Sequence, residues 1–195
     1  LRTRSLYLVL FFAPVVTSTV AVAMIWQQLF RSDGVLSSVI ANTLHIDPPD
    51  WLGDPHLALI SVCIVTIWMS VGLNTVIFLA GRMAIPKELY EAAEMDGATG
   101  LKRFAYVTFP IMANLYTVCT LLSTIWTLGD FNSVHFVSGG GPALQTHVLA
   151  TLGIRDAFEL GNPGLGMAAV ISALPLLIPL VILLMRRLAR GEVQL

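Results

Sequence analysis

The sequence has few charged residues: Lys, Arg, Asp and Glu make up 12% of its 195 residues. A soluble domain normally has about 25%. Hydrophobic residues reach 56%, above the usual level of about 45–50%. This composition excludes a disordered chain and argues against a soluble enzyme. The net charge of −1, without any basic stripe, also argues against nucleic-acid binding.

Cysteine is almost absent as well. Cys63 and Cys119 are the two cysteines, and both lie in apolar runs, so no disulfide framework is predicted. The sequence begins with Leu1 rather than Met, from which we expect that part of the fold precedes it.

Residues for catalysis or metal binding are also lacking. The only lysines, Lys87 and Lys102, do not follow a glycine-rich loop, so no phosphate-binding loop is predicted. Gly139–Pro142 is glycine-rich but is expected to form a flexible turn. The four histidines show no metal-ligand spacing; they are His45, His56, His135 and His147. An intramembrane enzyme would therefore have no candidate acid, base or metal ligand within the apolar runs.

Four long stretches carry no charge: Ser5–Phe30, Pro55–Gly81, Phe104–Gly129 and Leu160–Met185. About 20 helical residues cross a hydrocarbon core of about 30 Å, and only helices satisfy the backbone of such segments in lipid. The sequence therefore predicts an all-α integral membrane protein. Its four predicted transmembrane helices cover residues 6–30, 57–81, 104–129 and 162–185.

The first stretch has an alternative interpretation. Arg2 and Arg4 precede an apolar run, and Ala21–Ala23 resembles a signal-peptide cleavage site. The apolar run continues to Phe30, however, which is longer than the apolar region of a signal peptide, about 7–15 residues. A transmembrane helix is therefore the preferred interpretation.

The flanking cations predict an orientation. Nine of the 11 Lys and Arg residues lie in the amino end, the loop 82–103 and the tail, whereas Arg31 and Arg155 alone lie in the loops 31–54 and 130–159. Positive residues favour the cytoplasmic side. We therefore expect both ends and the loop 82–103 to be cytoplasmic. Trp26, Trp51 and Trp126 fall near the outer ends of helices, as expected of interfacial residues.

Hydroxyl groups form a stripe along the third predicted span. Thr117, Thr120, Thr124 and Thr127 recur at helical spacing, with Ser123 and Trp126 beside them. Ser70 and Asn74 add polar groups to the second span. Neutral hydrogen-bonding groups beside a flat ring suit an uncharged, hydroxyl-rich solute. The alternative is that these groups bond their own helix or neighbouring helices.

Small residues and prolines predict how the spans pack and bend. Gly166, Ala169 and Ala173 share one face of the fourth span, which favours close helix contact. Prolines are expected to bend or interrupt helices; they are Pro14, Pro110, Pro175 and Pro179.

The loop 82–103 is predicted to form a helix–turn–helix. Pro86 suits the first turn of a helix and Glu88 favours its dipole, while Gly97 suits the position just beyond its end. Glu91-Ala92-Ala93 combines one charge with two small side chains, which allows a partner to approach closely. An ordinary amphipathic interfacial loop is the alternative.

The spacing of this loop resembles a known family. Glu91-Ala92-Ala93, then Gly97, then Val107-Thr108-Phe109-Pro110 resembles the EAA loop of inner-membrane permease subunits of binding-protein-dependent ABC importers. Three further phrases resemble the carbohydrate branch, which includes maltose and glycerol-3-phosphate permeases; they are 51–55 (WLGDP), 85–90 (IPKELY) and 138–142 (SGGGP).

The resemblance implies a type I permease with about six core helices, of which this chain would lack the first two. It implies a second homologous permease subunit, two cytoplasmic ATPases that supply the ATP and Mg sites, and an extracytoplasmic binding protein that delivers a sugar. The permease itself would not be catalytic and would lie in a bacterial or archaeal cytoplasmic membrane. A non-sugar importer, or a membrane scaffold or channel without active transport, remains the alternative.

The resemblance also implies two sets of functional residues. The expected ATPase-coupling residues are Pro86, Leu89, Tyr90, Glu91, Ala92, Ala93, Asp96 and Gly97. The expected solute-pathway residues are Ser70, Asn74, Ser123, Trp126 and Thr127.

Overall fold

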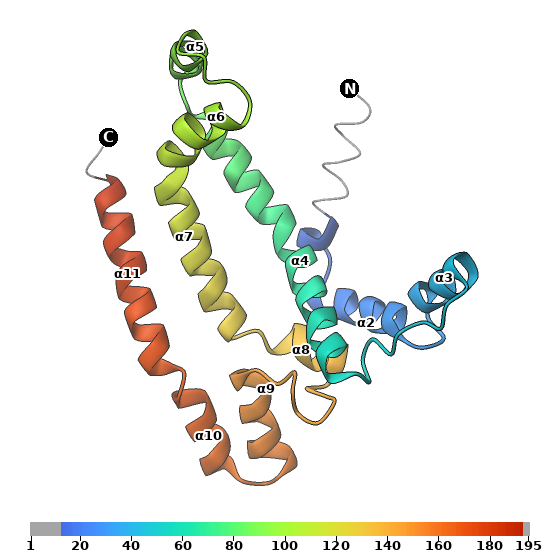
Figure 1. Cartoon of the computed structure of the whole chain (residues 1–195). Coiled ribbons are helices and arrows are strands. Elements are labelled where there is room, and N and C mark those ends of the chain that lie inside the picture. The colour runs from blue at the N-terminus through green and yellow to red at the C-terminus, as the bar shows by residue number, and fades with distance from the viewer. Residues whose placement is uncertain (1–12, 193–195) are drawn as a thin grey trace. The chain divides into compact units, whose positions relative to one another are not determined.

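The computed structural model describes residues 13–192, and that range contains helices and no strands (Figure 1). These residues divide into two compact units. The first unit extends to residue 72 and includes 126–176; the second comprises 73–125 and the residues from 177 onward. Three long helices pass from one unit into the other; they are α4 (Pro55–Met83), α7 (Phe109–Leu128) and α11 (Leu174–Glu192).

The shorter helices belong to single units. Those of the first unit are α2 (Thr19–Phe30), α3 (Val35–Leu44), α8 (Phe131–Ser138), α9 (Leu149–Ile154), the π-helix η2 (Arg155–Glu159) and α10 (Pro163–Ile171). Those of the second unit are α5 (Lys87–Met95), α6 (Leu101–Arg103) and the π-helix η1 (Phe104–Thr108).

Three helical segments of the described residues are long and apolar enough to cross a membrane: Pro55–Met83, Leu101–Leu128 and Pro163–Ala189. They coincide with the second, third and fourth predicted spans. Their most apolar windows are only 17%, 22% and 11% buried. Most of their apolar side chains are thus free to face lipid or other helices.

The first predicted span, 6–30, is not a continuous helix in the part that the structure describes. Residues 6–12, like Arg2 and Arg4, lie outside the described residues. Beyond them, a helical turn at residues 13–16 ends before Ser18, whose ψ of 129° is extended. Thr17 Oγ1 donates a hydrogen bond of 2.7 Å to the Ala13 carbonyl, and α2 then begins at Thr19. The 12 residues of α2 extend only about 18 Å, too short to cross a bilayer.

Proline accounts for irregularities in the other spans. α10 ends at Ile171 and α11 begins at Leu174, because Pro175 has no N–H to bond the carbonyl four residues earlier. Near Pro110, the helix that enters the membrane contains the π-turn η1, closed by a bond from the Phe109 N–H to the Phe104 carbonyl. Pro179 lies inside α11 without ending it.

A buried apolar cluster joins α2, α4 and α8 in the first unit. Its members are Ala23, Phe30, Val62, Val65, Val134 and Val137. Trp26 and Trp51 pack against this cluster, with centroids 5.4 and 5.8 Å from the Phe30 ring. These two indoles therefore contribute to the core, whereas Trp126 on α7 is exposed, as an interfacial residue would be.

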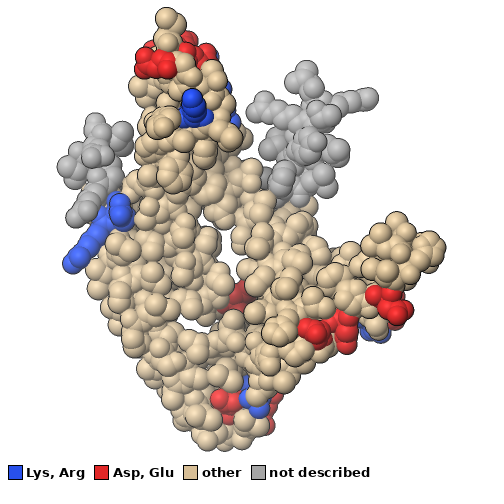
Figure 2. Space-filling model, viewed as in Figure 1, with Lys and Arg blue, Asp and Glu red and all other residues tan. Residues whose placement is uncertain are grey.

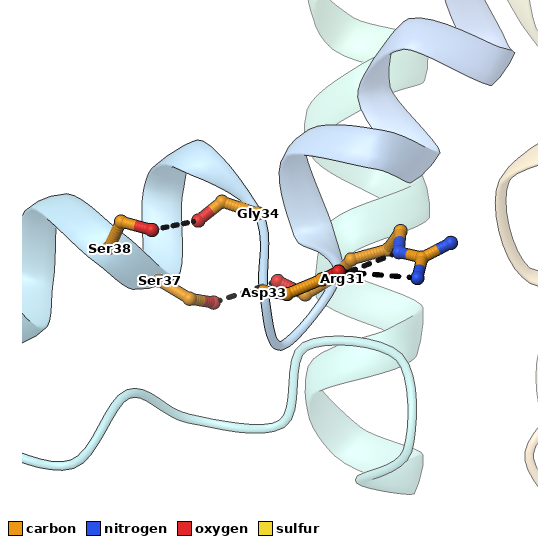
Figure 3. Close-up of polar contacts among 5 residues, drawn as sticks. All are labelled: Arg31, Asp33, Gly34, Ser37 and Ser38. Atoms are coloured by element: carbon orange, nitrogen blue, oxygen red, sulfur yellow. Dashed lines mark hydrogen bonds and ion pairs between the residues drawn. The ribbon is translucent and has the colours of Figure 1, made fainter.

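A compact corner connects α2 to α3 (Figure 3). Arg31 Nε and Nη2 donate to the two carboxylate oxygens of Asp33, at 2.9 and 3.3 Å. Ser37 Oγ donates to the Arg31 carbonyl at 3.0 Å. The hydrogen bond from Arg31 lowers the pKa of Asp33, and a backbone hydrogen bond and the charge of Arg31 lower it further. The lone cation of the loop 31–54 is therefore paired locally.

The two predicted outer loops contain helices. The loop 31–54 includes α3, and the loop 130–159 includes α8, α9 and η2. Asp130 caps α8, because its Oδ1 accepts a 3.1 Å hydrogen bond from the Ser133 N–H. The distribution of Lys and Arg, from which we predicted the sides of the membrane, gave no sign of this helical content.

The segment Gly139–Pro142 is not a free turn, which corrects the expectation of flexibility. Ser138 Oγ lies 2.8 Å from Thr146 Oγ1, and Thr146 Oγ1 donates to the Gly141 carbonyl at 2.6 Å. A Cβ added to Gly140 would collide with the His147 ring. Thr146 itself is buried, so hydrogen bonds to a buried side chain hold the loop in place.

The segments α9–η2 and α10 form a helical hairpin in which the two arms lie side by side (Figure 1). Gly166 on α10 is buried, and a Cβ there would collide with the Gly153 carbonyl and with Ala157. The predicted close contact of the small-residue face is confirmed at Gly166. Its counterpart, Gly153, was not predicted from the sequence.

Candidate functional site

The helix α5 begins one residue later than its sequence predicts. Pro86 immediately precedes it with a ψ of 139°, a conformation outside the helix, so Pro86 is the N-cap rather than a residue of the first turn. Glu88 lies in the first turn, where a carboxylate interacts favourably with the helix dipole.

The end of α5 is a Schellman motif centred on Gly97. The Ala98 N–H donates to the Ala93 carbonyl at 2.8 Å, and the Gly97 N–H donates to the Glu94 carbonyl at 3.0 Å. Gly97 has a φ of +77°, in the left-handed region that favours glycine. The prediction that Gly97 lies just beyond the helix is therefore confirmed by its conformation.

One face of α5 is attached to the helix that follows. Tyr90 Oη lies 3.1 Å from Thr108 Oγ1 of η1. Arg103 pairs with Glu94, and its guanidinium carbon lies 5.6 Å from the centroid of the Tyr90 ring. These contacts fix α5, α6 and η1 as one small hairpin, which we call the coupling hairpin (residues 86–108).

Another face of the coupling hairpin contains an open groove of about 550 Å³. The side chains of Ala92 and Ala93 make part of its floor, and Asp96 and Lys102 contribute the two charges among its lining residues. The remaining lining residues are Leu89, Gly97, Ala98, Tyr106 and Val107. Small side chains beside one negative and one positive residue suit the approach of another protein.

The structure brings five of the eight predicted coupling residues into this groove; they are Leu89, Ala92, Ala93, Asp96 and Gly97. Tyr90 contacts Thr108 instead, and Pro86 is the helix cap. Glu91 is exposed on α5. Figure 2 shows that acidic side chains gather over α5; they are Glu88, Glu91, Glu94 and Asp96.

Several groove and surface residues were missed by the sequence reasoning. Tyr106 and Val107 line the groove from η1, and their contribution depends on the chain reversal at residues 96–100. Exposed apolar side chains surround the hairpin: Met95 is 90% exposed and Leu101 is 86% exposed. Apolar residues within an otherwise polar loop are visible in the sequence, and they could have been used to predict a surface for a protein partner.

The predicted solute-pathway residues are divided between the two units. Ser70, Trp126 and Thr127 belong to the first unit, whereas Asn74 and Ser123 belong to the second. Trp126 and Thr127 are exposed on α7. Each residue thus lies on a long helix, as predicted.

Hydroxyl groups of the stripe donate to their own helices. Thr117 Oγ1 bonds the Ala113 carbonyl at 2.8 Å, and Thr124 Oγ1 bonds the Thr120 carbonyl at 2.8 Å. On α4, Ser70 Oγ bonds the Thr66 carbonyl at 2.8 Å. These bonds match the alternative in which the hydroxyls serve the helix, although each oxygen retains lone pairs that can accept a bond from a solute.

Residues 13–192 contain no group of three or more His, Cys, Asp or Glu side chains placed to hold a metal ion. His147 is one half-buried titratable group outside the spans. Its Nδ1 lies 3.0 Å from Thr151 Oγ1. Burial lowers the pKa of His147, and the nearby positive charge of Arg155 lowers it further.

The comparisons with known proteins agree with this arrangement. The chain is 32% identical over 168 residues to the trehalose/maltose transport system permease protein MalF of Thermococcus litoralis. It is 34% identical over 175 residues to the lactose transport system permease protein LacF of Rhizobium radiobacter. These matches cover 86% and 88% of the chain, which spans 57% and 58% of the length of these relatives.

A solved structure shares the fold. The crystal structure of a bacterial alginate ABC transporter, in complex with an alginate pentasaccharide-bound periplasmic protein, matches with a TM-score of 0.79 at 21% identity. The match covers 95% of this chain and 64% of that chain. The all-helical arrangement is therefore the type I ABC permease fold, in a membrane protein. Residues 2–192 match the family described as "Binding-protein-dependent transport system inner membrane component", and the chain belongs to that family.

Proposed function

We propose that this chain is the membrane-spanning permease of an ATP-driven importer that carries a sugar or a sugar-like solute. The observation that carries the proposal is the coupling hairpin in a chain of this family, whose relatives are named for trehalose, maltose, lactose and glycerol 3-phosphate transport. The solute class comes from these relatives, which agree on carbohydrates and a related polyol phosphate.

The partners follow from the same proposal. A second homologous permease subunit completes the pathway, an extracytoplasmic binding protein delivers the solute, and two cytoplasmic ATPases bind ATP and Mg. The chain itself is not catalytic and binds no cofactor of its own. The family description, which names binding-protein-dependent transport, supports the binding protein among these partners.

The coupling hairpin would receive the motion of an ATPase. The groove lined by Ala92 and Ala93 accepts a partner side chain closely, and exposed Glu91 offers a polar contact. The Tyr90–Thr108 and Arg103–Glu94 contacts join the hairpin to the helix Leu101–Leu128. Movement of α5 would thus be transmitted to that span, which changes the side from which the pathway is open.

The solute would pass along the polar side chains of α4 and α7. Ser70, Asn74, Ser123, Trp126 and Thr127 carry neutral donors, acceptors and one indole ring. Such groups suit a hydroxyl-rich solute, because they exchange hydrogen bonds without the cost of desolvating a charge.

The coupling hairpin and both chain ends would face the cytoplasm. Arg31 and Arg155, the cations of the outer loops, pair with Asp33 and Asp156. Among the described residues, Arg82, Lys87 and Lys102 form no ion pair. The difference in uncompensated positive charge supports this orientation.

The test is solute uptake by the assembled transporter. The full-length subunit is co-expressed with its permease and ATPase partners, purified, and reconstituted with the cognate binding protein. In Ala93→Trp the indole fills the groove, so we expect stimulated ATPase activity and sugar uptake to fall at least tenfold. Glu88→Gln, on α5 but outside the groove, is the matched control and should retain both activities.

Two results would contradict the proposal. If no ATP-binding subunit copurifies with the chain, the proposal that it belongs to an ATP-driven importer is wrong. If Ala93→Trp keeps full activity, the groove is not the site of ATPase coupling. If the importer is active but rejects every sugar and polyol phosphate, the solute class alone is wrong.

A further inference from the structure

A second cavity lies in the same unit as the coupling hairpin but shares no lining residue with its groove. It has a volume of about 590 Å³ and is bounded by the end of α4, by Tyr90 of α5, and by α6, η1 and the start of α7. Pockets of about 300–1,000 Å³ accommodate small ligands. Neither the solute pathway nor the ATPase contact proposed above uses this space.

Two of the residues that line the cavity are cationic. Arg82 and Arg103 line it, and none of its lining residues carries a carboxylate. Arg103 is already paired with Glu94, whereas Arg82 is exposed and has no ion-pair partner among residues 13–192. The guanidinium of Arg82 is therefore available for an anion, and its fork of N–H donors matches a phosphate group.

The lining of the cavity offers further donors. The hydroxyls of Tyr90 and Thr108 lie 3.1 Å apart in its wall. Gly100 and Leu101 also line the cavity, at the N-terminal end of the 28-residue helix Leu101–Leu128. The partial positive charge of a helix N-terminus adds to that of the two arginines.

Most of the remaining lining of the cavity is apolar and aromatic. Phe78, Leu79, Phe104, Met112 and Tyr116 line it, and the Phe78 and Tyr116 rings meet edge to face at 4.9 Å. Phe78 and Met112 belong to helices that are long and apolar enough to span a membrane. A small soluble anion would leave these apolar side chains without a contact, whereas an amphiphile would use both the cationic and the apolar part of the lining.

We propose that this cavity binds an anionic phospholipid, with the phosphate at Arg82 and Arg103 and the upper part of an acyl chain along Phe78 and Met112. The cavity lies where apolar spans meet the loop that contains Arg82 and Arg103. A lipid in the membrane leaflet on this side presents its headgroup at the same level. Basic pockets between membrane helices are suited to such headgroups. The volume accommodates a headgroup and the beginning of the chains, while the rest of the lipid remains in the bilayer.

The test measures lipid retention by the full-length subunit in its assembled transporter. The complex is exchanged into nanodiscs of phosphatidylglycerol and phosphatidylcholine, extracted in detergent, washed, and analysed for bound lipid. We expect phosphatidylglycerol to be enriched over phosphatidylcholine at least about fivefold. Arg82→Gln should abolish most of this enrichment, and Arg82→Lys should retain part of it.

Lys102→Gln is the matched control, because Lys102 is a cation of the same loop that lines the other groove. It should keep the enrichment within about twofold, a change smaller than one cation contributes. Equal retention of the two lipids would overturn the proposal, as would an equal loss in Lys102→Gln, which would indicate diffuse surface charge. Displacement of the lipid by millimolar inorganic phosphate would show a free-anion site instead. Gel filtration of each variant confirms that the complex is intact.

Discussion

At the residue scale, Gly97 is constrained by its backbone rather than by its neighbours. Its φ is +77°, and a Cβ added there would meet no atom within 4 Å. Gly97→Ala should therefore destabilise the end of α5 by about 1–2 kcal/mol, through the left-handed conformation alone. Thermal unfolding of the assembled transporter and stimulated ATPase activity measure the effect.

Gly97→Asn separates conformation from side-chain bulk. Asparagine adopts the left-handed conformation more readily than alanine, so this variant should fall between wild type and Gly97→Ala. An Asn variant that is worse than the Ala variant would show that space, and not the φ angle, requires glycine.

His147 gives the first unit a pH-dependent stability. Because burial lowers the pKa of His147 in the folded protein, the unfolded chain takes up the proton at a higher pH. Stability is therefore highest above the ordinary histidine pKa of about 6.5 and decreases as the pH falls below it. The neighbouring charges are Arg155, Asp156, Glu159 and His135.

The prediction is a smaller pH slope in His147→Gln. Thermal midpoints between pH 5.5 and 8 should change less with pH in this variant than in the wild type. Thr43→Ser, at an exposed side chain that does not titrate, should keep the wild-type slope. Equal slopes in all three proteins would mean that His147 does not titrate differently on folding.

At the element scale, the helical hairpin of α9, η2 and α10 depends on close backbone approach. A Cβ at Gly166 would meet the Gly153 carbonyl and the Ala157 backbone, neither of which can rotate away. Gly166→Ala should destabilise the first unit by about 1–3 kcal/mol, the usual cost of overpacking.

Gly164→Ala is the control on the same helix. Its added Cβ meets only the Asn162 side chain, at 3.7 Å, and alanine favours a helix over glycine by about 1 kcal/mol. We expect no loss, or a small gain, in the thermal midpoint. If Gly166→Ala were equally harmless, the two arms of the hairpin would separate more easily than the structure indicates.

Elements differ in how far their sequences predicted them. α5 and its end were predictable because Pro86, Glu88 and Gly97 are local signals whose effects extend over one turn. The break before α2 was not predictable from charge, because residues 17–18 are uncharged like the residues on either side of them. The π-turn η1 was also missed, although Pro110 marked the helix as irregular.

At the scale of the whole molecule, orientation in the membrane is the main expectation to test. Thr99→Cys, in the exposed turn of the coupling hairpin, should react with a membrane-impermeant maleimide only in inverted vesicles. Asn42→Cys, exposed on α3, should react in intact cells. Both changes are made after Cys63 and Cys119 are replaced by serine.

The two reporters control for each other, since each must react from one side alone. Reaction of Thr99→Cys in intact cells would place the coupling hairpin outside the cytoplasm. The proposed contact with cytoplasmic ATPases would then be wrong, together with the assignment of both chain ends.

The sequence by itself determined that this is a helical membrane protein of the permease family. Uncharged stretches of span length, the distribution of Lys and Arg, and the spacing from Glu91 to Pro110 are properties of composition and order along the chain. Their physical basis is the cost of placing charge or unpaired backbone groups in lipid.

Only the tertiary structure decided which of the predicted residues lie close together. Five coupling residues share a groove with Tyr106 and Val107, while Tyr90 faces a separate cavity with Arg82. Helical periodicity gives the face of a residue on its own helix but not the neighbour that covers it, because that depends on chain reversals at Gly97 and Gly100. Those reversals place residues from distant turns side by side, and this proximity is absent from the linear sequence.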